Sequence, residues 1–385
     1  MENVLVVRYG EISLKGKNRY FFENLLLRKM KEALEGLAPR RIWKTYGRIY
    51  VEVFDDDSAV MERLSRVFGI FSFSPARVVS LNLDSIKEAA LLELVSCGEG
   101  GTFKVETKRP NKTFPLKSPE ISREVGHHLL ENSENWTVDV HQPQVRVRLE
   151  IRREGAFIYS QDVKGLGGLP VGSTGRALLL ISGGIDSPVA GWLAMKRGIQ
   201  PVGLHFYSFP FTSERSKEKV MDLCRILASY GGPFRLYVNY FTEIQKAIRK
   251  NCPEEFYVTV MRRMMFRLAE TIARKEKALA LITGENLGQV ASQTLESMAV
   301  INEVVRLPVL RPLVTMDKIE IIEYARKIGT YDTSILPYED CCTLFVPKHP
   351  ATRPNLTRVK EAEEKLDIPS LLAESLEKTQ VLDII

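Results

Sequence analysis

The pattern of apolar and polar positions divides the chain into two parts. Up to about residue 160, strand-like runs such as residues 48–54 alternate apolar and polar positions, and segments such as residues 18–37 carry apolar residues at helical spacing. Alternation is typical of a strand with one buried face, and the helical spacing is typical of an amphipathic helix. This part is therefore predicted to form small α+β units.

From residue 176 onward the pattern changes to apolar strands that alternate with helices. The run RALLLI at residues 176–181 is apolar throughout, as expected of a strand that is buried on both faces. Further strands are expected at residues 199–208, 234–240 and 278–283, with helices at residues 188–198, 213–230 and 258–277. This order predicts an α/β domain built on a doubly wound parallel sheet with helices on both faces.

A glycine-rich run separates the two patterns. KGLGGLPVGSTG, residues 164–175, combines glycines with a proline and small polar residues, which is typical of a linker. We therefore expect three domains, at residues 1–60, 61–165 and 173–385.

Composition restricts the class of protein. The chain has 385 residues, of which 44% are hydrophobic and 26% charged, as in folded proteins of more than one domain. It has no apolar run long enough to cross a membrane, and its N-terminus resembles a buried strand and not a signal peptide. Five scattered cysteines indicate no disulfide framework and favour a reducing, cytoplasmic setting. We expect no protein-held metal site, and the net charge of +6 suits a polyanionic partner without requiring one.

The segment SGGIDS, residues 182–187, follows the first buried strand and precedes a helix expected to begin at Pro188. Glycines allow the backbone to approach an anion, the amide groups at a helix start point toward it, and Ser182 and Ser187 add hydroxyl donors. Glycine-rich turns of this kind are common, but SGGxDS after an apolar strand resembles the PP-loop of ATP pyrophosphatases. The Walker pattern GxxxxGK[ST] is absent from the sequence. The resemblance implies cleavage between the α- and β-phosphates of ATP, adenylation of an oxygen and release of pyrophosphate.

Two adjacent cysteines, Cys341 and Cys342, lie in LPYEDCCTLFVP, after a helix predicted at residues 316–328. Most buried cysteines are structural, and adjacent cysteines carry no motif of their own. A polar, proline-bounded loop favours a nucleophile, and nearby Lys348, His349 and Arg353 would favour the thiolate. On the residues alone both interpretations remain open.

Four segments together resemble the ThiI family, the tRNA 4-thiouridine synthetases, over nearly the whole chain. They are RYGEISLKGKNRYFF (8–22), VETKRPNKTFPLKSPEISREVG (105–126), LLLISGGIDSPVAGW (178–192) and EDCC (339–342). The resemblance implies a PP-loop ATP pyrophosphatase domain preceded by a ferredoxin-like domain and an RNA-binding THUMP domain. It also implies ATP-dependent transfer of sulfur to a uridine of tRNA, giving 4-thiouridine at position 8 through an adenylated uridine, with Mg²⁺ accompanying ATP.

The same resemblance implies roles for particular residues. Asp186 and a cysteine of the pair would be catalytic; Cys342 fits the family pattern slightly better, without excluding Cys341. The implied ATP contacts are Leu180, Ile181, Ser182, Gly183, Gly184, Ser187, His205, Phe206, Arg262, Gly284 and Gln293. Judged by spacing alone, Arg262 and Arg263 would instead lie on a solvated helix face.

Residues 101–118 carry five basic residues against one acidic residue. Basic side chains neutralise phosphates, and an exposed aromatic ring stacks on an unpaired base. A solvated basic face is the alternative, but the family resemblance favours RNA binding. The expected RNA contacts are Lys104, Lys108, Arg109, Lys112, Phe114, Lys117 and Arg123.

Many relatives carry a C-terminal rhodanese domain with a persulfide cysteine, whereas no cysteine follows Cys342 in this sequence. We therefore expect sulfur to arrive as a persulfide from an external donor such as a cysteine desulfurase, and a role in thiamine thiazole synthesis is in doubt. Relatives suggest a homodimer.

Three other classes remain as alternatives: a PP-loop ligase of the amidotransferase type, a different tRNA thiolase, and a non-catalytic RNA-binding protein that retains the ATP fold. The basic N-terminal part and the absence of a visible glutaminase domain argue against the ligase. The N-terminal modules argue against the other thiolase. ATP–pyrophosphate exchange with and without tRNA would separate these alternatives.

Overall fold

The computed structural model describes residues 2–38, 40–54, 58–290, 292–338, 347 and 350–384. The chain forms two compact units, Met1–Gly168 and Leu169–Ile385, so that the division falls inside the glycine-rich run at residues 164–175. Each unit has its own sheet and its own core.

Within its described residues, the first unit holds a nine-stranded sheet in the order β2-β3-β1-β4-β8-β7-β5-β6, with β9 paired to β4. Antiparallel pairing of β4 with β8 joins the first half of this sheet to the second, so the two smaller domains expected from the sequence share one sheet. The boundary near residue 60 stays a prediction. The strands are β1 (Glu2–Tyr9), β2 (Ile42–Thr45), β3 (Arg48–Glu52), β4 (Ile70–Val79), β5 (Gly101–Lys108), β6 (Trp136–Val138), β7 (Val145–Ile151), β8 (Ala156–Tyr159) and β9 (Val163–Lys164).

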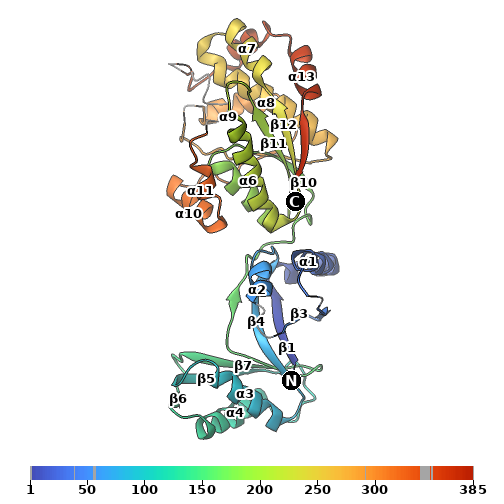
Figure 1. Ribbon diagram of the computed structural model, residues 1–385, viewed down its shortest axis with the longest axis vertical. Helices are drawn as coiled ribbons and strands as arrows, with labels where there is room; N and C mark the ends of the chain where they lie inside the picture. Colours follow the sequence, from blue (N-terminus) through green and yellow to red (C-terminus); the bar gives the residue numbers. More distant parts are fainter. Residues whose placement is uncertain are drawn as a thin grey trace. The chain divides into compact units, whose positions relative to one another are not determined.

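Four helices accompany this sheet: α1 (Arg19–Ala33), α2 (Ser58–Ser65), α3 (Leu83–Val95) and α4 (Ser118–Asn132). The helix predicted at residues 18–37 is present as α1, which ends four residues earlier. Helices α3 and α4 pack against each other and bury Ile86 and Ile121 against Phe103 and Val147 of the sheet (Figure 1). The α+β architecture predicted for this part is confirmed.

In the second unit, six strands form one sheet over the described residues, in the order β14-β13-β10-β11-β12-β15. All neighbours are parallel except β15, which pairs antiparallel with β12 at the edge. The predicted doubly wound parallel sheet is confirmed. The strands are β10 (Arg176–Leu180), β11 (Gln200–Tyr207), β12 (Phe234–Tyr240), β13 (Leu281–Ile282), β14 (Val309–Leu310) and β15 (Gln380–Ile384).

Helices cover both faces of this sheet (Figure 1). Leu179 of β10 lies against Gly191 of α5, whereas the neighbouring Leu178 belongs to a core shared with α8, so these two helices lie on opposite faces. Helices α6 and α10 pack against α5, and α7, α9, α12 and α13 pack against α8. The helices are α5 (Asp186–Lys196), α6 (Glu214–Gly231), α7 (Thr242–Asn251), α8 (Tyr257–Lys275), α9 (Leu295–Asn302), α10 (Lys318–Ile328), α11 (Tyr331–Ser334), α12 (Leu356–Glu363) and α13 (Ile368–Glu377).

The strand order creates a switch point beside β10. From β10 the chain continues to β11 and β12 on one side and later returns to β13 and β14 on the other. In open α/β sheets, ligands bind outside the carboxyl ends of the strands at such a point. The sheet therefore places a candidate site at the ends of β10 and β13. In the described part of the chain, no helix is long and apolar enough to cross a membrane.

Candidate functional site: a nucleotide pocket at the sheet switch point

A cavity of about 550 Å³ lies at this switch point. Its size falls within the range of pockets that hold small-molecule ligands. Eleven of the residues expected at the nucleotide or in catalysis line it: Leu180, Ile181, Ser182, Gly184, Asp186, Ser187, His205, Phe206, Arg262, Gly284 and Gln293. Gly183 lies within the same loop but not among the lining residues. The structure thus brings most of the predicted set to one cavity, whereas their contact with ATP stays a prediction.

The loop between β10 and α5 is closed by its two serines. The Ser187 hydroxyl accepts a hydrogen bond from the backbone N–H of Ser182 at 2.9 Å, and the backbone N–H of Gly184 donates to the Ser182 hydroxyl at 3.3 Å. Helix α5 begins at Asp186, two residues earlier than the predicted start at Pro188. Because the first turn of a helix has no internal acceptors for its N–H groups, Pro188 is tolerated there without loss. The first two residues of α5, Asp186 and Ser187, line the cavity, so the N-terminal end of the helix lies at the site.

Gly284 is required by the loop itself. A Cβ atom at this position would lie 2.7 Å from the backbone nitrogen of Ser187, closer than real Cβ contacts allow. The absence of a side chain at Gly284 therefore lets the segment after β13 approach the PP-loop closely. The sequence pattern puts the start of the next helix at residues 289–294, but α9 begins only at Leu295, and the Thr294 side chain caps it by accepting a hydrogen bond from the backbone N–H of Ser297.

Asp186 has two partners in the structure. Lys318 Nζ, at the start of α10, lies 2.5 Å from Asp186 Oδ1, and Gln289 Nε2 donates to Oδ2 at 2.9 Å. No local pattern in the sequence indicates either contact, because these residues are more than a hundred positions away from Asp186. The carboxylate therefore fixes a lysine and an amide beside the PP-loop, which explains an acidic residue next to a phosphate-binding loop.

Neighbouring arginines on α8 have different environments, and neither lies on a solvated face. Arg262 lines the cavity and forms an ion pair with Glu285 at 2.7 Å. Arg263 is only 1% exposed and is held by Glu363 through two hydrogen bonds of 2.9 Å. The solvated-face interpretation is therefore wrong for both, because α8 is buried on most of its circumference.

The end of β11 contributes the opposite wall. His205 is buried, and its Nδ1 donates to the carbonyl oxygen of Ile181 at 3.1 Å, which ties β11 to the end of β10. Gln293 lines the cavity with a buried Oε1 that accepts no hydrogen bond from the described residues. A buried acceptor of this kind normally finds a partner, so Gln293 fits a polar ligand in the cavity.

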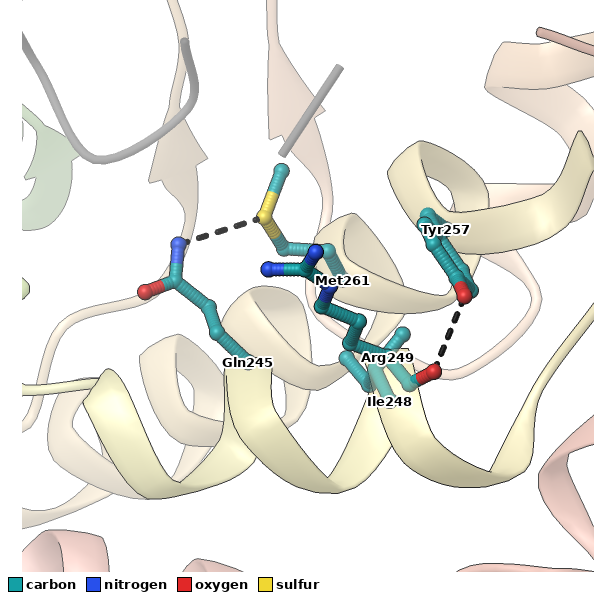
Figure 2. Close-up of a pocket in the computed structure, with 5 residues that line it drawn as sticks. All are labelled: Gln245, Ile248, Arg249, Tyr257 and Met261. Carbon is teal, nitrogen blue, oxygen red and sulfur yellow. Dashed lines mark hydrogen bonds between the residues drawn. The ribbon is translucent and has the colours of Figure 1, made fainter. Parts of the chain in front are cut away.

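A second, far smaller cavity lies between α7 and α8 (Figure 2). Met261 lines both cavities, and Gln245 Nε2 lies 3.8 Å from its sulfur (Figure 2). Tyr257 closes the other side by donating its hydroxyl to the Arg249 carbonyl at 2.9 Å. At about 10 Å³ this space matches a single water molecule and does not extend the site.

The cysteine pair, Cys341 and Cys342, lies outside the described residues, as do Lys348 and His349. The helix predicted before it is present as α10, which starts at Lys318. Among the other cysteines, Cys224 and Cys252 are buried; burial raises the pKa of the Cys224 thiol and raises that of Cys252 to about 11. Neither has the character of a nucleophile.

The residues expected at RNA lie in the first unit, on β5 and α4 and in the loop between them. Lys108, Lys112, Lys117 and Arg123 are exposed, and Lys104 and Arg109 are half-buried. Arg109 is turned inward and donates to the carbonyl oxygens of Lys112 and Phe114 at 3.1 and 2.8 Å, so it shapes the loop.

Phe114 requires a correction. Its ring is 7% exposed and belongs to the core between α4 and the sheet. The loop folds the ring inward because burying an aromatic side chain is favourable and the core offers it apolar neighbours. The ring is not available to stack on a base.

Sequence reasoning missed several residues at the site, above all Glu285, Gln289, Arg311 and Lys318. Glu285 directly follows Gly284, one of the expected ATP contacts, and this proximity is the one local signal that could have marked it. The others are brought in by tertiary structure, and no local pattern marks them.

A parallel α/β sheet, a PP-loop at its switch point and a nucleotide-sized cavity define an ATP pyrophosphatase fold of the PP-loop class. Family comparison extends this to the whole chain. The model described as thiamine biosynthesis protein (ThiI) matches residues 172–368, the ThiI ferredoxin-like domain matches residues 4–74, and the THUMP domain matches residues 81–161. The chain belongs to the ThiI family.

Individual relatives agree over the full length. A probable tRNA sulfurtransferase of Moorella thermoacetica is 64% identical over 100% of this chain and 98% of its own. One from Halothermothrix orenii is 56% identical over 100% of this chain and 99% of its own. A crystal structure of a 4-thiouridine synthetase in complex with RNA and ATP superposes with a TM-score of 0.94 at 40% identity, covering both chains completely.

Proposed function

We propose that this protein is an ATP-dependent tRNA sulfurtransferase that converts uridine 8 of tRNA to 4-thiouridine. One observation carries the proposal: the PP-loop and the expected nucleotide contacts line one cavity, in a chain that matches tRNA sulfurtransferases from end to end. The similar structure that holds RNA and ATP supports both substrates.

The first step is activation of the uridine. The PP-loop amides and the hydroxyls of Ser182 and Ser187 receive the phosphates of ATP at the start of α5. The uridine O4 attacks the α-phosphorus, pyrophosphate leaves, and C4 then carries AMP in place of a poor leaving group. Lys318, held by Asp186, and Arg262, held by Glu285, supply positive charge where negative charge develops.

Magnesium fits this site as an ion that accompanies the nucleotide. The described residues contain no group of three or more His, Cys, Asp or Glu side chains able to hold a metal. Mg²⁺ commonly binds through substrate phosphates and only one or two carboxylates. Asp186 is the lining carboxylate best placed to contribute, and the ion would neutralise phosphate charge.

The second step is delivery of sulfur. A persulfide on Cys341 or Cys342 would attack C4 of the adenylated uridine with its terminal sulfur, and AMP would leave. The second thiol of the pair would then attack the carrier Sγ, break its bond to the transferred sulfur and release 4-thiouridine. The resulting disulfide would be reduced by a thiol reductant before the next turnover. Cys224 does not suit that task, because it is fully buried within α6.

Sulfur must enter as a persulfide from a separate donor protein, for which a cysteine desulfurase has the required chemistry. We place tRNA on the basic face of the first unit, at Lys108, Lys112, Lys117 and Arg123. A homodimer in the cytoplasm completes the proposal, following the family.

Pyrophosphate release tests the activation step. With ATP, release should depend on added tRNA and should not respond to ammonia or small amines. An amidotransferase-type ligase would release pyrophosphate without tRNA, and a non-catalytic RNA-binding protein would release none under either condition. Either of those results would contradict the proposal.

A further inference from the structure

We propose that Glu285 is a positioning residue for the reaction, whose buried carboxylate fixes the guanidinium of Arg262 at the nucleotide pocket. The inference rests on the proposed function in taking ATP as the ligand of that pocket. It concerns a residue that the PP-loop pattern does not include.

Glu285 stands where three elements meet. It follows β13 at the switch point, lines the cavity and is 2% exposed. Arg262 reaches it from α8, with Nη2 2.7 Å from Oε1, and Arg311 reaches it from the end of β14, with Nε 2.7 Å from Oε2. The Thr283 hydroxyl donates to Oε2 at 2.9 Å. Two hydrogen bonds to Oε2 therefore hold the carboxylate in place, while Oε1 forms the ion pair with Arg262 and accepts no hydrogen bond from the described residues.

The charges in this cluster do not cancel. One carboxylate lies between two guanidinium groups, which leaves one positive charge in excess. Burial by itself raises the pKa of Glu285, but Arg262 and Arg311 outweigh this effect and hold the pKa below its usual value, so the group is ionised. A buried carboxylate is tolerated because both partners are present.

Arg262 is the arginine that faces the nucleotide. It lines the cavity, and Glu285 is its one ion-pair partner among the described residues. Arg311 does not line the cavity; its Nη2 donates to Asn302 Oδ1 at 2.8 Å. A guanidinium carries five N–H donors in a fixed plane, so Arg262 keeps donors for an anionic ligand while Glu285 sets its orientation.

The next residue along α8 provides a natural comparison. Arg263 and Arg267 share the buried carboxylate of Glu363, with distances of 2.7 to 2.9 Å. This cluster also joins two arginines through one buried glutamate, with Glu303 as a further partner of Arg263 at 3.1 Å, but none of its members lines the cavity. It ties α12 to α8 and serves as a matched structural control.

The test shortens the carboxylate while keeping its charge. Glu285→Asp withdraws the carboxylate by about 1.5 Å, one carbon–carbon bond. Calorimetric titration of the full chain should show ATP binding weakened about tenfold, or about 1.4 kcal/mol. Adenosine, which has no phosphates, should bind as it does to the wild type. In an Arg262→Ala background, Glu285→Asp should cause no further loss of ATP affinity.

Glu363→Asp should lower the melting temperature without changing ATP affinity. If Glu285→Asp does not fold, Thr283→Val removes one hydrogen bond to the same carboxylate and should weaken ATP binding, but not adenosine binding, by about threefold.

Unchanged ATP affinity in Glu285→Asp would overturn the inference. Equal weakening of ATP and adenosine binding by Glu285→Asp would also overturn it, because Glu285 would then act on the pocket in general. The same conclusion would follow if Glu285→Asp reduced ATP affinity as much in the Arg262→Ala background as in the wild type. A wild type that binds ATP in these titrations but thiolates no tRNA would contradict the proposed function alone. Failure of the two proposals is therefore distinguishable.

Discussion

The Asp186 carboxylate shows how much depends on one side chain. It holds Lys318 at 2.5 Å and Gln289 at 2.9 Å beside the PP-loop. We expect Asp186→Ala to abolish thiolation, because the lysine loses its anchor beside the phosphates. Affinity for tRNA should be nearly intact, since the proposed RNA contacts lie in the other unit. Filter binding and a thiolation assay measure the two effects.

A suitable control is Asp222→Ala, which removes an exposed carboxylate that pairs with Arg225 on α6. Exposed ion pairs contribute little, so activity should stay near the wild-type value. A large loss of tRNA affinity in folded Asp186→Ala would contradict the assignment of this loop to the nucleotide.

The cysteine pair provides a second prediction at the residue scale. The double variant Cys341→Ser, Cys342→Ser should still bind ATP and tRNA and form adenylated tRNA. It should fail to accept sulfur from a persulfide protein. Adenylation needs the PP-loop, whereas delivery needs a carrier thiol. With free sulfide, part of the activity should return, because a small nucleophile can attack directly.

Absorbance of 4-thiouridine for each variant and each donor measures the outcome. Cys342→Ser alone should lose more activity than Cys341→Ser, and Cys252→Ser, in a buried position, serves as the control. Wild-type turnover by the double variant with a persulfide donor would show that the pair is structural.

At the scale of elements, the basic face on β5 and α4 and in the loop between them makes a quantitative prediction. Lys112 and Lys117 are exposed in that loop. Replacing both with glutamine should reduce the slope of log affinity for tRNA against log salt by about 1.8, or about 0.9 for each phosphate contact on duplex RNA or DNA. Lys246→Gln on α7, an exposed lysine of the other unit, is the control. An unchanged slope would mean that this face is merely solvated.

The first unit also contains a buried ion-pair cluster around Glu150 of β7, which makes the stability of the unit depend on pH. Glu150 is 2% exposed and accepts hydrogen bonds from Arg48 at 3.0 Å and Arg152 at 2.9 Å. Burial alone would raise its pKa, but these arginines outweigh burial and lower the pKa to about 2. A carboxyl whose pKa falls on folding stabilises the fold above its unfolded pKa of about 4.3 and loses that contribution as pH falls toward 2.

We therefore expect the first unit to lose stability, on the order of 3 kcal/mol, between about pH 4.3 and about pH 2. Urea unfolding at several pH values measures this loss. Glu150→Gln should flatten the dependence within that window, whereas Glu124→Gln, an exposed partner of Lys87, should not. An identical pH profile for Glu150→Gln and the wild type would contradict the account.

The elements also show what the sequence could and could not predict. A strand buried on both faces and a glycine-rich loop are local patterns, so β10 and the PP-loop were predictable from residues 176–187, and the parallel sheet from the alternation of strands and helices up to residue 283. The starts of α5 and α9 were misplaced, because a few local contacts at its cap decide where a helix begins. The predicted RNA contact of Phe114 was wrong, because whether its ring is exposed depends on how the loop folds back onto the core. The ion pair of Lys318 with Asp186 could not be predicted, because it joins residues 132 positions apart and no local pattern marks it.

At the scale of the whole molecule, the proposed RNA contacts and the nucleotide cavity lie in different compact units. The first unit presents the basic face, and the second holds the cavity with its PP-loop. An enzyme that modifies one uridine of a long RNA needs both, since affinity for phosphates along the RNA selects the substrate while the pocket activates a single base. This division agrees with the full-length match to tRNA sulfurtransferases.

The most direct test of the central claim is mass spectrometry of tRNA nucleosides after incubation with the full chain, ATP, Mg²⁺ and a persulfide-loaded cysteine desulfurase. Unmodified transcript should gain 4-thiouridine, and sequencing of the digest should place it at position 8. Omission of ATP should abolish the product, and a transcript with cytidine at position 8 should stay unmodified. Folded protein that yields no 4-thiouridine under these conditions, or that forms it without ATP, would contradict the account.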